Sequence, residues 1–442
     1  MTDLAKLFNE HVQQRVQTYS SILNDCQFDG VVISAGVPHV YFEDDQEAAF
    51  HPNPHFAHWC PESSPYHLLC IKPGDKKPTL VFYSPDDYWH EPPSLAHSDW
   101  TGHFHVVMVK DMDQRWQQLG SLSNFAFVGP EADEARKRQL IANPRNLLAR
   151  LDWQRALKSP YEVRCLELAN ALAAKGHKAV KDTFAGFKQT GSELALHLAY
   201  LQAGPMSETD LSYNSIIGIN EKSAFLHYHA KRQHVANPQT MLIDCGALYR
   251  GYCADITRTF AKDSAHPVFK EILKGLDSIQ LKLVDAVKAD ASFLSLHKSC
   301  HEQIAELLLQ VGVLKSCDKH TAVSQNLTFN FLPHGLGHML GIQVHDVAGK
   351  QINERGDEAP PDQEFPRLRT LRPLRSNEVI TIEPGIYFIP TLLDKCRNAD
   401  SSNYFNWRLI DELIPFGGMR IEDNILVLKD SRENLTRKFI PF

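Results

Sequence analysis

Residues 241–260 read MLIDCGALYRGYCADITRTF, and the interpretation of the whole chain starts from this stretch. Two segments of strand character flank a short polar turn, and each carries one aspartate, Asp244 or Asp255, among apolar or small neighbours. If Tyr249 and Arg250 form the tip of a two-residue hairpin, the aspartates face each other with Cβ atoms about 4.5–5.5 Å apart. Carboxylates that close and half-buried repel each other unless a cation lies between them. The alternative is two solvated aspartates on an exposed sheet face, so the metal interpretation depends on finding further ligands.

Three later motifs each offer one more side chain that can bind a metal. HGLGH at 334–338 has two glycines and no glutamate between its histidines, so it does not favour the helix of the H-E-x-x-H zinc proteases. VITIEPG at 379–385 is an apolar strand that ends at Glu383, and RIEDN at 420–424 carries Glu422 just before another apolar strand. Each motif alone is weak, because a glutamate in a strand is commonly an edge residue paired with a neighbour. Together with the aspartates they supply five oxygen and nitrogen ligands, which suits two ions about 3.5–4 Å apart with a bridging hydroxide as nucleophile.

Composition excludes several other classes of protein. The chain has 442 residues, 43% hydrophobic and 22% charged, with a formal net charge of −7, so it resembles an ordinary globular protein and gives no reason to expect nucleic-acid binding. No run of 18 apolar residues predicts a membrane span. Nine scattered cysteines without a C-x-x-C pair, and an N-terminus without a signal-peptide pattern, predict reduced thiols in a cytoplasmic protein.

The order of helical and strand patterns predicts two domains. In the first, we expect helices over 3–26 and 132–150 and strands over 30–34, 67–71, 79–83 and 125–129, which together make an α/β domain. The sequence SPYE at 159–162 is a capping box with proline at the first helical position, and it predicts a long helix to about 188 that opens the second domain. There we expect helices over 192–204, 266–289 and 293–312, and strands over 214–219 and 224–227.

A segment of the first domain, residues 42–58, is acidic and then rich in histidine and proline, with His51, His55 and His58 close together. We interpret it as a polar loop. A transition-metal site is the alternative, but the spacing is neither helical nor strand-like and does not by itself make the ligands converge.

The ordered set Asp244, Asp255, His338, Glu383 and Glu422 resembles the ligands of the pita-bread metallopeptidases, which include methionine aminopeptidase, aminopeptidase P and Xaa-Pro dipeptidase (prolidase). The likeness extends over nearly the whole chain. The stretches DCGALYRGYCADITRTF, HGLGHMLGIQVHDVAG, TIEPGIYF and GGMRIEDN are similar to prolidase motifs. YFEDDQEAAF and FYSPDDYWHEPP are similar to bacterial prolidases, including those called organophosphorus acid anhydrolases.

The resemblance implies an α/β (α+β) fold with a creatinase-like N-terminal domain, residues 1–155, for dimerisation and pocket closure, and a pita-bread catalytic domain, residues 156–442. It implies two Mn²⁺ ions per subunit, replaceable by Co²⁺ or other divalent ions, in a homodimer. The implied activity is hydrolysis of dipeptides with C-terminal proline by a dinuclear-metal-activated bridging hydroxide. The alternative is an aminopeptidase P that acts on longer Xaa-Pro peptides. A side activity on organophosphate triesters is expected to be weak, because Phe293 stands where some relatives have tyrosine.

Residue roles follow from the same resemblance. Asp244 and Asp255 bind one ion, and Asp255, His338, Glu383 and Glu422 bind the other, with Asp255 and Glu422 shared. The expected catalytic residues are Glu383, His227 and His345. The expected substrate-binding residues are His334, Arg369, Arg420, Tyr213, Val344 and, from the partner subunit, the residue equivalent to Asp45.

Overall fold

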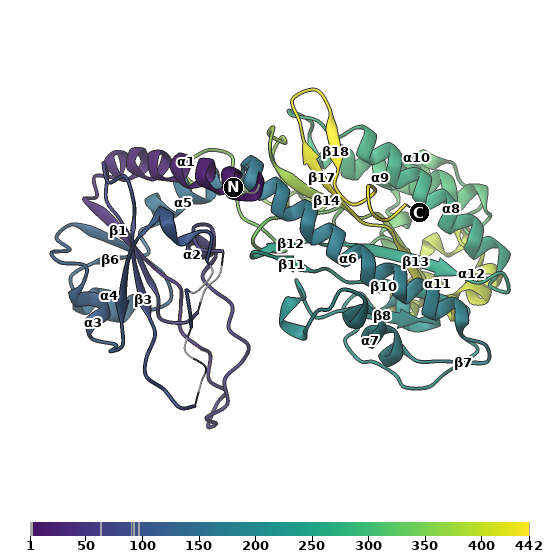
Figure 1. Ribbon diagram of the computed structural model, residues 1–442. Coiled ribbons are helices and arrows are strands. Elements are labelled where there is room, and N and C mark those ends of the chain that lie inside the picture. The colour runs from purple at the N-terminus through teal and green to yellow at the C-terminus, as the bar shows by residue number, and fades with distance from the viewer. Residues whose placement is uncertain (1–2, 62–63, 90, 92, 96–97, 442) are drawn as a thin grey trace. The chain divides into compact units, whose positions relative to one another are not determined.

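The computed structural model describes residues 3–61, 64–89, 91, 93–95 and 98–441, and the chain forms two compact units (Figure 1). The first unit comprises Met1–Arg164 with Ile352–Glu358, and the second comprises Cys165–Gln351 with Ala359–Phe442. Within the described residues, we find no helix that is both long and apolar enough to cross a membrane.

The first unit is built on a mixed six-stranded sheet with strand order β4-β3-β2-β1-β5-β6. All five residues of the central strand β1 are buried, as expected for a strand covered on both faces. The core includes Val32, Leu68, Val81 and Phe127 from four strands and Trp116 from a short helix. The elements are α1 (Asp3–Asp25), β1 (Gly30–Ser34), α2 (Pro54–Ala57), β2 (Leu68–Ile71), β3 (Thr79–Tyr83), β4 (His105–Val109), α3 (Gln114–Gln117), β5 (Phe125–Val128), α4 (Ala132–Lys137), β6 (Ile141–Ala142), α5 (Arg145–Arg155) and the beginning of α6 (Pro160–Gly186).

Two expectations for this unit are wrong. The single helix expected over 132–150 is interrupted by β6, because Gln139 and Asn143 take left-handed conformations and Pro144 begins a new helix. The expected polar loop at 42–58 contains the short helix α2, which starts at the N-cap Asn53, and His58 behind it is buried.

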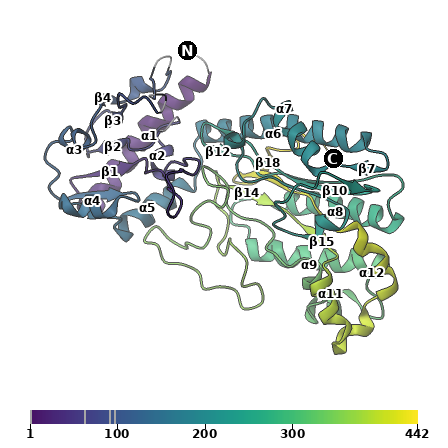
Figure 2. The same cartoon turned by 90° about the horizontal axis from the view of Figure 1, so that it is seen from below.

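The second unit layers helices on both sides of small antiparallel sheets. Figure 2 shows α6 and α7 on one side of the strands and α8 and α9 on the other. A core of α6, α7, β8 and β10 side chains packs Val180, Leu196, Ile217 and Ile243 together. The elements after α6 are β7 (Thr190–Gly191), α7 (Glu193–Ala203), β8 (Ile216–Ile219), β9 (Val235–Ala236), β10 (Thr240–Asp244), β11 (Leu248–Tyr249), β12 (Tyr252–Cys253), β13 (Thr257–Ala261), α8 (Pro267–Asp285), α9 (Phe293–Gln310), α10 (Lys319–Ser324), β14 (Val379–Ile382), β15 (Gly385–Tyr387), α11 (Pro390–Arg397), α12 (Trp407–Leu413), β16 (Gly418–Arg420), β17 (Asp423–Val427) and β18 (Arg432–Asn434). The strand expected at 224–227 is wrong, because a 3-10 helix over Asn220–Ala224 precedes an irregular segment there.

The central hairpin forms with a tip different from the expected one. Tyr249 pairs with Tyr252, and Asp244 lies opposite Thr257, so Arg250 and Gly251 form the turn. Both turn residues have positive φ, 49° and 83°, as a type I′ turn requires. The register therefore differs from the expected one by two residues. Because side chains alternate with a period of two, this shift leaves both aspartates on the same face of the ribbon.

Candidate metal centre

Five metal-capable side chains stand at strand ends or beside them in the second unit. Asp244 ends β10, Glu383 follows β14, Glu422 precedes β17, and Asp255 and His338 lie in the adjoining loops. Backbone contacts hold these segments together: Glu422 pairs with Thr257 in an isolated β-bridge, and the Thr381 N–H donates to the His338 carbonyl at 2.9 Å. Strand ends thus supply fixed positions for ligands that are far apart in the sequence.

The side chains converge on a common point. One ligand atom each from Asp255, His338 and Glu422 lies within 4.8 Å of the others, and all three residues are buried. His338 Nε2 is 3.3 Å from Asp255 Oδ2 and 3.7 Å from Glu383 Oε1. Asp244 joins the group through Tyr213, whose hydroxyl donates to Asp244 Oδ1 at 2.6 Å and to Asp255 Oδ1 at 2.7 Å.

The second ring nitrogen of His338 fixes which nitrogen can bind a metal. Nδ1 lies 3.0 Å from the Met339 carbonyl oxygen, and because a carbonyl only accepts, Nδ1 carries the proton. Nε2 then faces Asp255 and Glu383 and is the nitrogen that would bind a metal. A histidine that donates its other N–H to a backbone carbonyl is the usual arrangement around a bound metal.

Neighbouring donors orient the carboxylates. The Arg420 guanidinium donates to Asp244 Oδ2 at 2.5 Å and to the Tyr387 hydroxyl at 2.7 Å, and its Nε donates to Thr257 Oγ1 at 2.9 Å. Thr257 in turn donates to Glu422 Oε2 at 2.7 Å. These buried bonds leave little rotational freedom to either acid.

The electrostatics fit a cation. Burial, followed by repulsion from Asp255 and other carboxylates, raises the pKa of Glu422 well above its ordinary value. Burial likewise raises the pKa of Glu383 to about 7, although His338 and Arg420 oppose the shift. Four carboxylates share this space, with Arg420 as the cation in direct contact with Asp244. Divalent ions would remove the excess negative charge, so the residues present fit the metal that the pattern predicts.

A cavity of about 490 Å³ opens onto this cluster. Its walls contain most of the predicted site residues. These are Asp244, Asp255, His338, Glu383, Glu422, His227, His345, His334, Arg369 and Arg420. Burial lowers the pKa of His334 to about 3 and that of His345 to about 4, so both rings are neutral at pH 7.

The remaining predicted site residues do not line this cavity. Among the described residues that line the cavity, Tyr213 and Val344 do not appear, and Tyr213 instead bonds to both aspartates. Asp45 belongs to the first unit, where it is exposed in a loop closed by the Val40–Glu47 bridge.

Several contributors were not predicted. Tyr387 accepts from Arg420 and contacts His334 Nε2 at 2.9 Å, Thr257 bonds to Glu422, and Lys350 lines the cavity. Tyr387 and Thr257 lie within the motifs TIEPGIYF and DITRTF. Their closeness in sequence to the expected ligands could have identified them as site residues.

Comparison with known families agrees with this geometry. The family model described as metallopeptidase family M24 matches residues 164–429, more than half of the chain. The chain belongs to metallopeptidase family M24. A second model, the Xaa-Pro dipeptidase N-terminal domain, matches residues 6–153. Among relatives of this M24 protein, the Xaa-Pro dipeptidases of Pseudoalteromonas atlantica and Shewanella sp. (strain ANA-3) are 38% and 37% identical, with 99% of both chains covered. The predicted membership of the bacterial prolidase family is therefore confirmed.

Solved structures of aminopeptidase P share the fold. Escherichia coli aminopeptidase P with the inhibitor Pro-Leu superposes with a TM-score of 0.72 at 22% identity, covering 98% of this chain and 95% of that one. The zinc-substituted E. coli enzyme in complex with product gives the same TM-score at 23% identity, with the same coverage. This likeness confirms the predicted fold class, an N-terminal α/β domain followed by a pita-bread catalytic domain.

Proposed function

We propose that this M24 protein is an Xaa-Pro dipeptidase that hydrolyses dipeptides with C-terminal proline and depends on two divalent metal ions. The observation that carries the proposal is the convergence of four carboxylates and one imidazole on a single cavity. Relatives named for this activity, 38% identical over almost the whole chain, support it.

The five ligands would divide between the ions. Asp244 would hold one, His338 and Glu383 would hold the other, and Asp255 and Glu422 would be shared by both. A set of carboxylates and imidazole suits Mn²⁺, and Co²⁺ or another divalent ion can replace it. When bound, the ions supply Lewis acidity and lower the pKa of water so that it becomes a nucleophile at neutral pH.

The protein's own groups then move the protons and orient the peptide. Glu383 takes a proton from the attacking water and returns it to the prolyl nitrogen. His227 and His345 also line the cavity, and their ring N–H groups can donate hydrogen bonds to the oxygen that becomes negative as the carbonyl is attacked.

The cavity offers a reason for the choice of substrate. The nitrogen of an Xaa-Pro bond has no hydrogen, so peptidases that must bind an N–H at this position cannot accept it. Arg369 lines the cavity and can pair with the free carboxylate of a C-terminal proline, which would select dipeptides. In our proposal His334 and Arg420 contact the bound dipeptide, and Tyr213 and Val344 lie near its first side chain.

We extend the proposal to a homodimer in the cytoplasm. In it, the first domain (residues 1–155) forms the dimer contact, and the partner subunit supplies an acidic residue equivalent to Asp45 to the catalytic domain (residues 156–442). Phe42, Tyr88 and Trp89 of the first unit are 91%, 87% and 75% exposed, and the proposed dimer contact would cover them. Phe42 lies in the same loop as Asp45.

Activity on organophosphate triesters is proposed to be minor. Phe293 has no hydroxyl and is fully buried in the first turn of α9, so it cannot hydrogen-bond a phosphoryl substrate.

Substrate length tests the proposal. With Mn²⁺ present, we expect efficient hydrolysis of Ala-Pro and at least a 100-fold lower kcat/KM for Ala-Pro-Ala, about the loss of one desolvated charge pair. Efficient cleavage of the tripeptide alone would identify an aminopeptidase P instead. Arg369→Met should raise KM for Ala-Pro and so reduce the difference in kcat/KM between Ala-Pro and Ala-Pro-Ala.

A further inference from the structure

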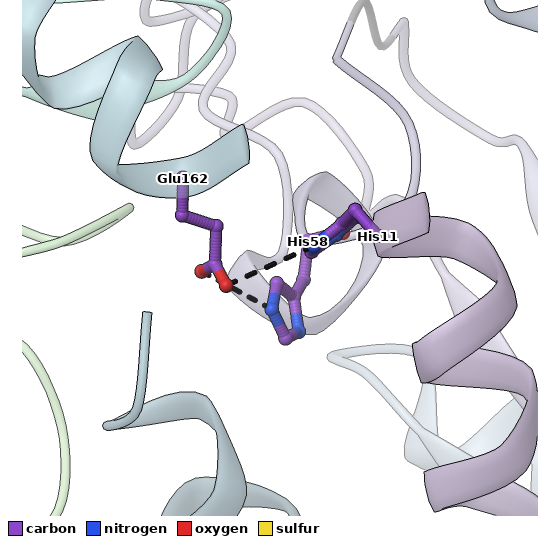
Figure 3. A group of neighbouring side chains, drawn as sticks. All are labelled: His11, His58 and Glu162. Atoms are coloured by element: carbon purple, nitrogen blue, oxygen red, sulfur yellow. Dashed lines mark hydrogen bonds and ion pairs between the residues drawn. The ribbon is translucent and has the colours of Figure 1, made fainter. Parts of the chain in front are cut away.

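A second group of metal-capable side chains lies in the first unit, on three separate elements. His11 comes from α1, His58 is the C-cap residue of α2, and Glu162 lies in the first turn of α6 (Figure 3). Their exposed fractions are 1%, 3% and 0%. One nitrogen from each ring and one carboxylate oxygen lie within 4.8 Å of one another.

The spacing of these atoms suits a tetrahedral ion. His58 Nε2 is 3.3 Å from Glu162 Oε1, and His11 Nδ1 is 3.8 Å from Glu162 Oε2 (Figure 3). Ligand atoms around tetrahedral zinc are about 3.4 Å apart, given bonds of about 2.0–2.1 Å. Small side-chain movements therefore suffice to bring all three atoms to bonding distance.

Neighbouring groups already orient two of the three ligands. His11 Nε2 lies 2.9 Å from the His58 carbonyl oxygen, so Nε2 carries the proton, and the Nδ1 lone pair accepts from the Ser159 hydroxyl at 2.8 Å with Glu162 Oε2 3.8 Å away. Glu162 Oε2 accepts from the backbone N–H of Ser159 at 2.8 Å, which is the capping interaction at the start of α6. The cap aims the carboxylate at the histidines and leaves Oε1 available.

Two buried atoms of the cluster pair with each other at 3.3 Å and have no other polar partner among the described residues. They are His58 Nε2 and Glu162 Oε1, the two atoms that face each other. Burial lowers the pKa of His58 to about 3 and that of His11 to about 4, so both rings are neutral and in the form that binds metals. Buried polar atoms usually have hydrogen bonds of good geometry, and an ion bound between these two would give both a stronger partner.

Nearby cations decide which kind of ion fits. Arg15 is buried one turn after His11, and the ammonium group of Lys158 donates to the carbonyls of Arg155 and Ala156 at 2.9 and 3.2 Å. These charges repel any cation, and the single carboxylate of the cluster supplies too few anionic oxygens to offset that repulsion for Mg²⁺ or Ca²⁺. An ion that bonds strongly to neutral imidazole, above all Zn²⁺, remains favourable.

We propose that His11, His58 and Glu162 bind one structural zinc ion that joins α1, the residue after α2 and the start of α6. Water or the Ser159 hydroxyl, which is 2.8 Å from His11 Nδ1, completes the coordination. This site lies in the first unit and takes no part in peptide cleavage. A negative result at this site would therefore leave the proposed function unaffected.

Zinc content tests the site. Purified full-length protein is stripped with a chelator, incubated with excess Zn²⁺, desalted, and analysed for zinc per chain by mass spectrometry. Because the catalytic centre also binds zinc, the informative quantity is a difference: His58→Ala should hold one ion fewer than the wild type. The matched control is His51→Ala, an exposed histidine of the same segment, which should keep the wild-type content. Equal zinc in His58→Ala and wild type would overturn the proposal.

A second measurement needs no variant and guards against misfolding of His58→Ala. Crystals of the wild-type protein grown with Zn²⁺ should show an anomalous difference peak at the zinc edge between His11, His58 and Glu162. Peaks at the catalytic centre without one among these three side chains would refute the site.

Discussion

Among single residues, Glu383 has two proposed roles, as a metal ligand and as the group that carries the proton. Glu383→Gln keeps the size of the side chain but cannot accept and release the proton. We expect kcat for Ala-Pro to fall by about 10²–10⁴-fold, with the melting temperature little changed. The matched control is Glu358→Gln, an exposed glutamate outside the cavity lining, which should leave kcat unchanged. Near-normal turnover in Glu383→Gln would remove Glu383 from the mechanism.

A buried histidine of the first unit makes stability depend on pH. His67 accepts from the Tyr83 N–H at 3.1 Å, and burial, assisted by Arg115, lowers its pKa to about 3. The unfolded state binds the proton near pH 6.5, so the neutral ring contributes stability above that pH and loses it as the pH falls. Between pH 7.5 and 5.0 this loss amounts to about 2 kcal/mol.

Urea unfolding of the chelated protein at the two pH values measures this effect. His67→Gln should remove about 2 kcal/mol of the pH-dependent change in unfolding free energy. His39→Gln, which alters an exposed histidine, should not. If the unfolding free energies of His67→Gln and wild type change equally between the two pH values, the His67 ring is not a neutral buried group in the folded protein.

Single residues also show how far the sequence could lead. The convergence of the five metal-capable side chains could be expected because each stands in a short motif at or beside a strand. The Tyr213 hydroxyl bond to both aspartates was not, because it joins positions 31 and 42 residues apart through tertiary packing. The sequence around His58 predicts only a polar loop. Its neighbours in space, His11 and Glu162, come from helices that are distant in the sequence.

At the scale of elements, the central hairpin depends on Gly246. A Cβ atom at this position would lie 1.9 Å from the Ala254 carbonyl oxygen, which is backbone and cannot move aside. Gly246→Ala should destabilise the protein by about 3 kcal/mol or more and weaken Mn²⁺ binding, because Ala254 adjoins Asp255.

The turn residue Gly251 provides a matched comparison. Its φ is 83° and no atom lies within 4 Å of an added Cβ, so Gly251→Ala should cost only about 1–2 kcal/mol of backbone strain. Urea unfolding distinguishes the two variants, and equal stability would show that the close approach at Gly246 is absent.

The same hairpin shows why element boundaries were harder to predict than element types. The composition predicts the strands correctly, but it predicts the tip at Tyr249 and Arg250, one position before the turn residues Arg250 and Gly251. Two consecutive residues with positive φ are needed, and Gly251 satisfies this requirement as the second of them. The expected helix over 132–150 failed for a related reason, because Gln139 and Asn143 take positive φ between α4 and α5.

At the scale of the whole molecule, the exposed apolar side chains of the first unit predict self-association. Phe42→Asp places a charge on the most exposed of them and should convert a dimer into monomers in sedimentation velocity. The control Phe439→Asp changes a 40% exposed phenylalanine of the second unit and should leave the dimer intact. A wild-type chain that sediments as a monomer at micromolar concentration would contradict the proposed assembly.

If the five converging side chains bind metal, cleavage of Xaa-Pro dipeptides depends on metal ions. Titration of the chelated full-length protein with Mn²⁺, with Ala-Pro hydrolysis and bound manganese followed together, measures this dependence. We expect negligible activity without metal and a rise to a plateau at about two ions per chain. Full activity in protein that holds less than about one ion in ten chains would contradict this dependence.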